Sequence, residues 1–100
     1  MYTNMISIPQ EFQPYLWSAP IAKLDIKKHE RYIIHQLLQY GDLSAFSWLK
    51  KIYGMDELRE VFLQHPTMMY TKQSLAFVTK YVLEIDNIKI QKERYVKSFR

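Results

Sequence analysis

The chain contains no cysteine, and only two of its 100 residues are glycine. Without cysteine it can form no disulfide, no cysteine-ligated zinc site and no thiol nucleophile. Two glycines are too few for a phosphate-binding loop, where several let backbone N–H groups approach the anion. Residues 1–8 lack the basic flank and apolar block of a secretory signal, and no apolar run approaches the roughly 20 residues of a membrane-spanning helix. These absences favour a cytoplasmic protein that does not bind a membrane.

Apolar residues make up 48% of the chain and aromatic residues 15%, which favours one globular domain with a real core over a disordered chain. The net charge of +4 is unevenly distributed. Residues 87–100 carry five basic side chains against one acidic side chain, whereas residues 1–86 are neutral. The charge pattern therefore predicts a helical domain over 1–86 and a basic tail or short helix over 87–100.

Both glycines follow a tyrosine at the end of a segment with helical spacing, at Tyr40-Gly41 and Tyr53-Gly54. Glycine tolerates the left-handed conformation that ends many helices, so each glycine is expected to be such a C-cap. An acidic residue follows each glycine closely and suits the start of the next helix. With Asp25 as the first N-cap, the predicted helices are 26–40, 43–53 and 55–64.

A fourth helix is predicted over about 72–84, with Thr71 as its N-cap. Its apolar residues cover most of its circumference, which is typical of a central helix. Three prolines at 9, 14 and 20 limit any helix in the first 26 residues to a turn or two. We therefore expect an all-α fold: a compact orthogonal bundle of four to five short helices with a proline-rich, irregular N-terminal arm.

No catalytic, cofactor-binding or metal-binding residues are predicted, so we expect a protein that is not an enzyme. His29 and His35 are not four residues apart, as the helical zinc-protease motif requires, and His35 falls mostly off the apolar stripe of its helix. Ser47 and Lys50 match a Ser-x-x-Lys motif, but the partner motifs of those acyl-enzymes are missing.

Large apolar residues outside the predicted core stripes favour a protein partner, because aromatic residues and methionine are enriched in interface cores. The alternative is that they close the core of the domain. The predicted partner-binding residues are Trp17, Trp48, Met68, Met69 and Tyr70. The partner would be another protein or a second copy of the chain, as in a structural homodimer.

A small nucleic-acid-binding regulator is the alternative function. The predicted third helix is acidic on its outer face, which argues against base reading by that helix. The basic tail, in which Tyr95 and Phe99 are interleaved, would give non-specific, salt-sensitive binding. The residues predicted to bind nucleic acid are Lys89, Lys92, Arg94, Lys97 and Arg100.

Several short pieces of the chain match one known family. They are Leu16-Trp17, Lys23-Leu24-Asp25, His29, Ile33-Ile34, Leu38-Gln39-Tyr40-Gly41-Asp42, Trp48-Leu49, Tyr53-Gly54 and the segment from Leu58 to Phe62. The chain resembles a group of small bacterial proteins that form a domain-of-unknown-function family, over residues 8–86. Members of that family often lie beside nucleotidyltransferase-type toxins of the abortive-infection kind. The resemblance therefore implies an antitoxin-like or toxin-associated role, and it transfers no catalytic residues.

Overall fold

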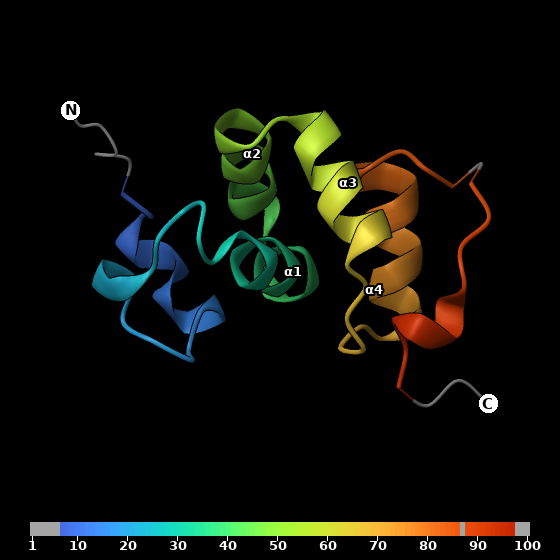
Figure 1. Cartoon of the computed structure of the whole chain (residues 1–100), viewed down its shortest axis with the longest axis horizontal. Coiled ribbons are helices and arrows are strands. Elements are labelled where there is room, and N and C mark those ends of the chain that lie inside the picture. The colour runs from blue at the N-terminus through green and yellow to red at the C-terminus, as the bar shows by residue number, and fades with distance from the viewer. Residues whose placement is uncertain (1–6, 87, 98–100) are drawn as a thin grey trace.

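The computed structural model describes residues 7–86 and 88–97. Within these ranges the chain forms helices and no strand, apart from one isolated bridge, so the all-α prediction is confirmed (Figure 1). The α-helices are α1 (Glu30–Tyr40), α2 (Leu43–Ile52), α3 (Met55–Gln64) and α4 (Lys72–Phe77). A π-helical turn, η3 (Val78–Val82), continues α4, and the 3-10 turns are η1 (Gln10–Tyr15), η2 (Ile21–Lys23) and η4 (Lys92–Arg94).

The central helix is α1, which is seen nearly end-on in Figure 1 between the N-terminal arm and α3. It packs against η1, α2 and α3, and six consecutive residues from 33 to 38 are buried. The prediction that the fourth helix is central is wrong. Phe77 and Tyr81 are 41% and 62% exposed, because only one side of α4 and η3 faces the core.

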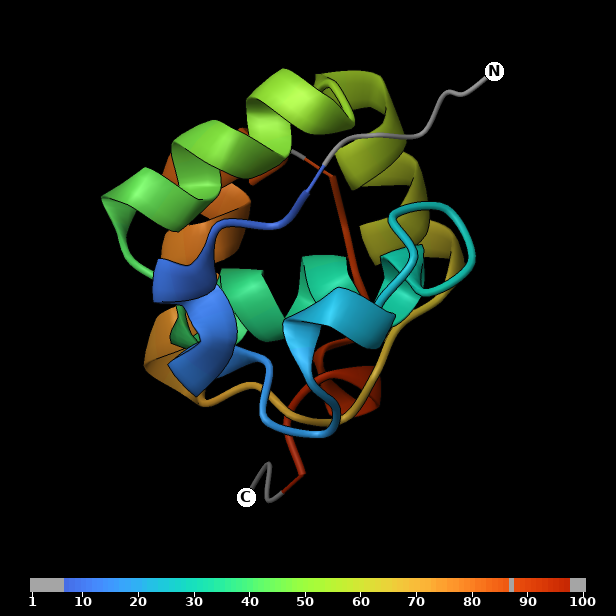
Figure 2. The same cartoon turned by 90° about the vertical axis from the view of Figure 1, so that its left-hand side faces the viewer.

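The N-terminal arm lies across α1, as Figure 2 shows. Phe12 and Leu16 are fully buried and anchor it to the core. The Gln13 side chain amide stabilises the turns, because its oxygen accepts from the Ile21 N–H at 2.9 Å and its nitrogen donates to the Leu16 carbonyl at 2.8 Å. The arm is therefore irregular, as predicted, but fixed by burial and hydrogen bonds.

The two glycines have different roles. Gly54 has φ +85° and ψ 154°, an extended backbone region that is almost restricted to glycine, so the predicted need for a positive φ is confirmed there. Gly41 is the C-cap of α1, as predicted, but its φ is −77°, so the left-handed backbone expected there is wrong. Gly41 is required for space instead, since a Cβ atom there would lie 2.5 Å from the Leu37 carbonyl oxygen and 2.7 Å from the Ala45 Cβ.

Three of the predicted helix starts are confirmed and one is wrong. Asp42 caps α2 by accepting from the Ala45 N–H at 3.0 Å, and Thr71 caps α4. However, α1 begins at Glu30, not after Asp25. The Asp25 carboxylate accepts from the N–H groups of residues 27 and 28, so it caps a separate turn before the helix, and these bonds lower the pKa of Asp25.

The C-terminal segment runs back beside α4 and contributes to the core (Figure 1). Tyr95 and Val96 are 2% and 5% exposed. The Tyr95 ring stacks on Phe62 with centroids 4.6 Å apart, and its hydroxyl donates to the Phe62 carbonyl at 2.7 Å. The short helix predicted in this segment is the single turn η4. The division of the chain between 86 and 87 stays a prediction, although both parts share one hydrophobic core.

Candidate functional site

The five predicted partner-binding residues differ widely in exposure. Trp17 is 59% exposed and contacts Tyr40 edge-to-face at 4.8 Å, and Met68 is 53% exposed. Trp48 and Met69 are half-buried and pack against the core. The expectation that Tyr70 is exposed is wrong, since only 3% of it is accessible. Whether the remaining residues bind a partner stays a prediction.

Tyr70 is buried because it belongs to a polar cluster inside the core. Its hydroxyl lies 2.8 Å from the His35 Nδ1, and the His35 Nε2 lies 2.8 Å from the His65 carbonyl oxygen. A carbonyl only accepts, so Nε2 carries the proton and Nδ1 accepts from the Tyr70 hydroxyl. Burial lowers the pKa of His35, which keeps the ring neutral. His35 is therefore part of the core, although it falls mostly off the apolar stripe predicted for its helix.

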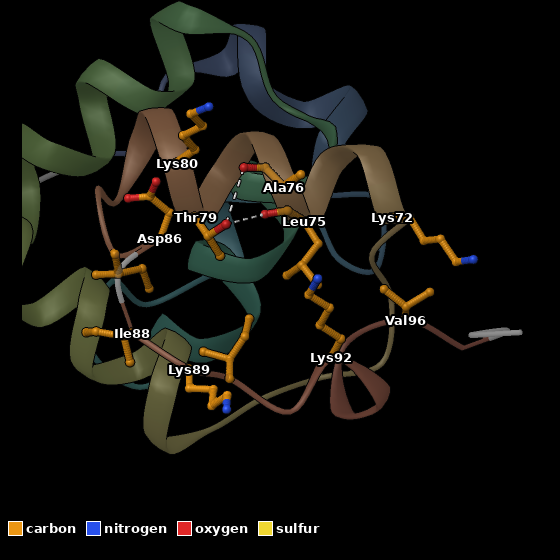
Figure 3. A pocket seen from close by; sticks show the side chains of 12 residues that line it. Lys72, Leu75, Ala76, Thr79, Lys80, Asp86, Ile88, Lys89, Lys92 and Val96 are labelled. Atoms are coloured by element: carbon orange, nitrogen blue, oxygen red, sulfur yellow. Dashed lines mark hydrogen bonds between the residues drawn. The ribbon is translucent and has the colours of Figure 1, made fainter.

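A groove of about 650 Å³ lies between α4 with η3 on one side and the described residues of 85–96, without 87, on the other (Figure 3). This volume falls within the usual range for ligand-binding pockets, about 300–1,000 Å³. Half of its lining side chains are apolar: Leu75, Ala76, Ile85, Ile88, Ile90 and Val96. The polar half is Lys72, Thr79, Lys80, Asp86, Lys89 and Lys92.

A reversal of the chain after η3 creates this groove. The wide turn of η3 closes with a bond from the Leu83 N–H to the Val78 carbonyl at 2.8 Å. Glu84 then adopts φ +55°, which is uncommon for a residue other than glycine. The Ile85 N–H bonds back to the Thr79 carbonyl at 2.7 Å. The next residues are thereby directed back along the helix that they have just left.

The interior of the groove has little hydrogen-bonding capacity. Its buried hydroxyl, on Thr79, donates to the carbonyls of Leu75 and Ala76 at 3.0 and 3.2 Å, as the dashed lines in Figure 3 show. This polar atom is therefore satisfied by its own helix. The described lining residues include no aromatic ring and no histidine. Such a surface offers apolar contact from half of its lining side chains and charge from the other half.

The charge at the rim is mostly positive. Four lysines and one aspartate line the groove, and the lysines come from both of its walls (Figure 3). Lys80 belongs to η3, where its Nζ lies 5.5 Å from the Tyr81 ring centroid. Lys89 and Lys92 belong to the opposite segment. The groove therefore combines an apolar floor with a cationic rim.

The residues predicted to bind nucleic acid do not share one cavity. Lys89 and Lys92 line the groove. Arg94 lines another cavity, of about 480 Å³, together with Arg31 and His65. Lys97 is exposed, and position 100 lies outside the described residues, as does position 99. Whether these residues bind nucleic acid stays a prediction.

The sequence model of a family of unknown function, DUF6922, matches residues 12–62, which are 51 of the 100 residues. The chain belongs to this family. No curated protein and no solved structure matches the chain. The match extends from the N-terminal arm of this DUF6922 protein to residue 62 in the last turn of α3, a shorter range than the predicted 8–86. All residues that line the groove follow the matched range.

The described part of this DUF6922 protein has neither a membrane-spanning helix nor a cluster of metal ligands. None of its described helices combines the length and apolarity needed to cross a membrane. The described residues also contain no cluster of three or more side chains that could hold a metal ion.

An exposed aromatic surface of this DUF6922 protein was missed by the sequence analysis. Phe77 and Tyr81 lie one turn apart with centroids 5.5 Å apart, and Phe46 of α2 approaches Phe77 at 6.1 Å. The sequence pattern places Phe77 and Tyr81 among the apolar residues that cover most of the circumference of the predicted fourth helix, and so predicts them in the core. Their i, i+4 spacing, to one side of the stripe of the buried Leu75, Val78 and Val82, was the signal for an exposed stripe.

A pair of carboxyl groups lies in a cavity of about 280 Å³ between α1 and α3. Burial and a hydrogen bond with the nearby Glu57 carboxyl raise the pKa of Glu30 to about 7 from its ordinary value of 4.5. The same cavity contains Tyr53, whose hydroxyl donates to the Ile26 carbonyl at 2.7 Å. Burial, with the negative charges of Glu30 and its neighbours, raises the pKa of Tyr53.

The substitution Glu30→Gln is expected to stabilise the DUF6922 fold at pH 8 more than at pH 5. The raised pKa means that the folded chain binds more protons than the unfolded chain between about pH 4.5 and 7. The stabilising protonated form is therefore lost as the pH rises through 7, and glutamine does not ionise. Urea unfolding of both proteins at both pH values measures the difference. The same change at the exposed Glu60 is the control, and a difference that is flat or falls with pH contradicts the prediction.

Proposed function

We propose that this chain is a non-catalytic protein-interaction module, and that the groove between α4 and residues 85–96 binds its partner. The observation that carries the proposal is the set of six apolar side chains that line the groove. Ile88 is 44% exposed there, and Ile90 is only partly buried. Removing such apolar surface from water is the main favourable term in most protein association. The lack of convergent reactive groups in the groove further supports binding over catalysis.

The partner that we propose is a nucleotidyltransferase-type toxin, and the role is antitoxin-like in a bacterial cytoplasm. The support for this part is the resemblance of the chain to proteins that lie beside such toxins. A protein partner also agrees with the exposed aromatic residues Trp17, Phe77 and Tyr81, since aromatic side chains are enriched at interfaces.

A nucleic-acid-binding regulator is the second candidate, and the positive rim of the groove favours it. Two observations favour a protein partner over it. Base stacking needs aromatic side chains, and the described groove lining has none. In addition, Lys89 and Arg94 line different cavities, so these cations do not form a single track for a phosphate backbone.

Filling the groove is expected to weaken capture of the partner at least about tenfold, the typical effect of disrupting an interface centre. Ala76 is exposed in the groove wall, so Ala76→Phe places a ring where the partner would bind. Gln73→Phe adds the same ring to an exposed position of α4 outside the lining. The measurement is co-expression with the product of the neighbouring gene, which the proposal expects to be toxin-type, followed by affinity purification, with thermal melts to confirm folding.

Equal capture by the two phenylalanine variants would show that the groove is not the binding surface. A wild-type chain that purifies alone as a monodisperse monomer would contradict the interaction module itself. Light scattering on the same sample identifies a homodimer, which would replace the toxin-type partner by a second copy of the chain.

A further inference from the structure

The positive charge of the groove is divided between its two walls. Lys80 lies on the helical wall, and Lys89 and Lys92 lie on the opposite segment. Asp86 is the single acidic residue among the described lining residues. A complementary occupant therefore carries carboxylates on both sides of an apolar centre.

This charge arrangement distinguishes a helix from a strand. An amphipathic helix has an apolar stripe that is bordered on both sides by polar positions, so its acidic residues can meet lysines on both walls. Side chains of a strand alternate between two opposite faces. If alternate residues of a strand filled the groove, the intervening acidic residues would point away from the lysines. A helix in a groove is also an established mode of peptide recognition.

The length of the groove wall sets the length of the occupant. Lys72 and Lys80 are eight residues apart on α4 and η3, which is roughly 12 Å at about 1.5 Å per residue. Two to three helical turns span this distance. Such a helix presents three or four apolar anchors at i, i+3, i+4 and i+7 spacing.

We propose that the groove binds a short amphipathic helix of the protein partner, with an apolar stripe and acidic residues along both borders. This inference rests on the proposed function, because it specifies the chemistry of the segment that enters the same groove. Surface charge pairs contribute modestly one by one and weaken with salt. The apolar floor therefore provides most of the affinity, and the lysines select acidic over basic helices.

The proposal is tested with synthetic helical peptides of about 14 residues, or four turns. The first carries leucine at i, i+3, i+4, i+7 and i+11 with glutamate on both borders. The second has glutamine in place of glutamate on one border, and the third has lysine in place of every glutamate. Fluorescence anisotropy with the full chain is expected to show tightest binding of the first peptide, several-fold weaker binding of the second, and at least about tenfold weaker binding of the third.

Charge exchange provides the decisive variant. In the double variant Lys80→Glu, Lys89→Glu, the lysine peptide is expected to bind better than the glutamate peptide. The matched control is Lys51→Glu, at an exposed position of α2 outside the groove, which should leave the order unchanged. Ala76→Phe should abolish binding of the glutamate peptide both in the wild-type chain and in the Lys51→Glu variant.

Equal binding of the glutamate and lysine peptides, no binding of any peptide, or displacement of the glutamate peptide by a random DNA duplex would overturn the proposal. The proposed function is tested separately. If Ala76→Phe blocks capture of the toxin-type protein but no peptide binds, the module stands and the acidic helix is rejected. If capture does not depend on the groove, the proposed function fails whatever the peptides do.

Discussion

Replacing Phe62 with alanine is expected to lower the free energy of unfolding by about 3–5 kcal/mol, the usual cost of deleting a buried aromatic ring. Phe62 is completely buried. Its ring contacts those of His35, Tyr70 and Tyr95 with centroids 6.0, 5.7 and 4.6 Å away. These three residues come from α1, the α3–α4 connector and the C-terminal segment. The cavity would therefore lie where three distant parts of the chain meet.

Phe77→Ala is the matched control for this prediction. It deletes the same ring, but Phe77 is 41% exposed, so the loss should stay below about 1.5 kcal/mol. Urea unfolding at one pH gives both values. Equal losses for the two variants would show that the aromatic cluster around Phe62 is not the centre of the core.

Replacing Tyr95 with alanine is expected to destabilise the chain by about 3 kcal/mol or more. The change removes the ring that stacks on Phe62 and the hydroxyl that donates to the Phe62 carbonyl. Tyr95→Phe keeps the ring and leaves that carbonyl without its donor, so about 1–3 kcal/mol is expected. Lys97→Ala, two residues further on and exposed, should change stability by less than about 0.5 kcal/mol.

Truncation of the C-terminal segment cannot separate the effect of its positive charge from the effect of its packing. Deleting residues 87–100 removes Tyr95 and Val96 from the core together with the basic side chains. A loss of nucleic-acid binding on truncation would therefore report unfolding as much as lost charge. Substituting Lys89 and Lys92 with glutamine keeps the core and changes only the charge. If truncation left stability unchanged, the packing of Tyr95 described above would be incorrect.

The boundaries of α2 and α3 could be predicted from the sequence because they depend on local chemistry. Asp42 caps a helix through a residue three positions away, and Gly54 needs only its own backbone freedom. The start of α1 was predicted wrongly because the Asp25 carboxylate stabilises a turn as well as a helix start. Local signals of this kind predict where a helix can begin, and neighbouring segments decide between the options.

The interior polar cluster and the groove could not be predicted, because they depend on contacts between distant residues. His35 and Tyr70 are 35 positions apart, and neither carries a local sign of burial. The groove exists because Glu84 reverses the chain at a position where the sequence has no glycine. The charge balance of the sequence shows that residues 87–100 are basic. Only the reversal of the chain places Lys89 and Lys92 opposite η3.

The π-helical turn η3 makes this face of the molecule tolerant of a change in chain length. A five-residue closure contains one residue more than an α-helical turn, so removing one residue between 78 and 82 would restore an ordinary helix. The wide turn already takes up the extra residue, so the side chains after the deletion would keep nearly their present directions. The same deletion from an ordinary α-helix would rotate every following side chain by roughly 100° about the axis. A single-codon deletion in η3 is therefore expected to disturb the binding face less than one in α1 would disturb the core.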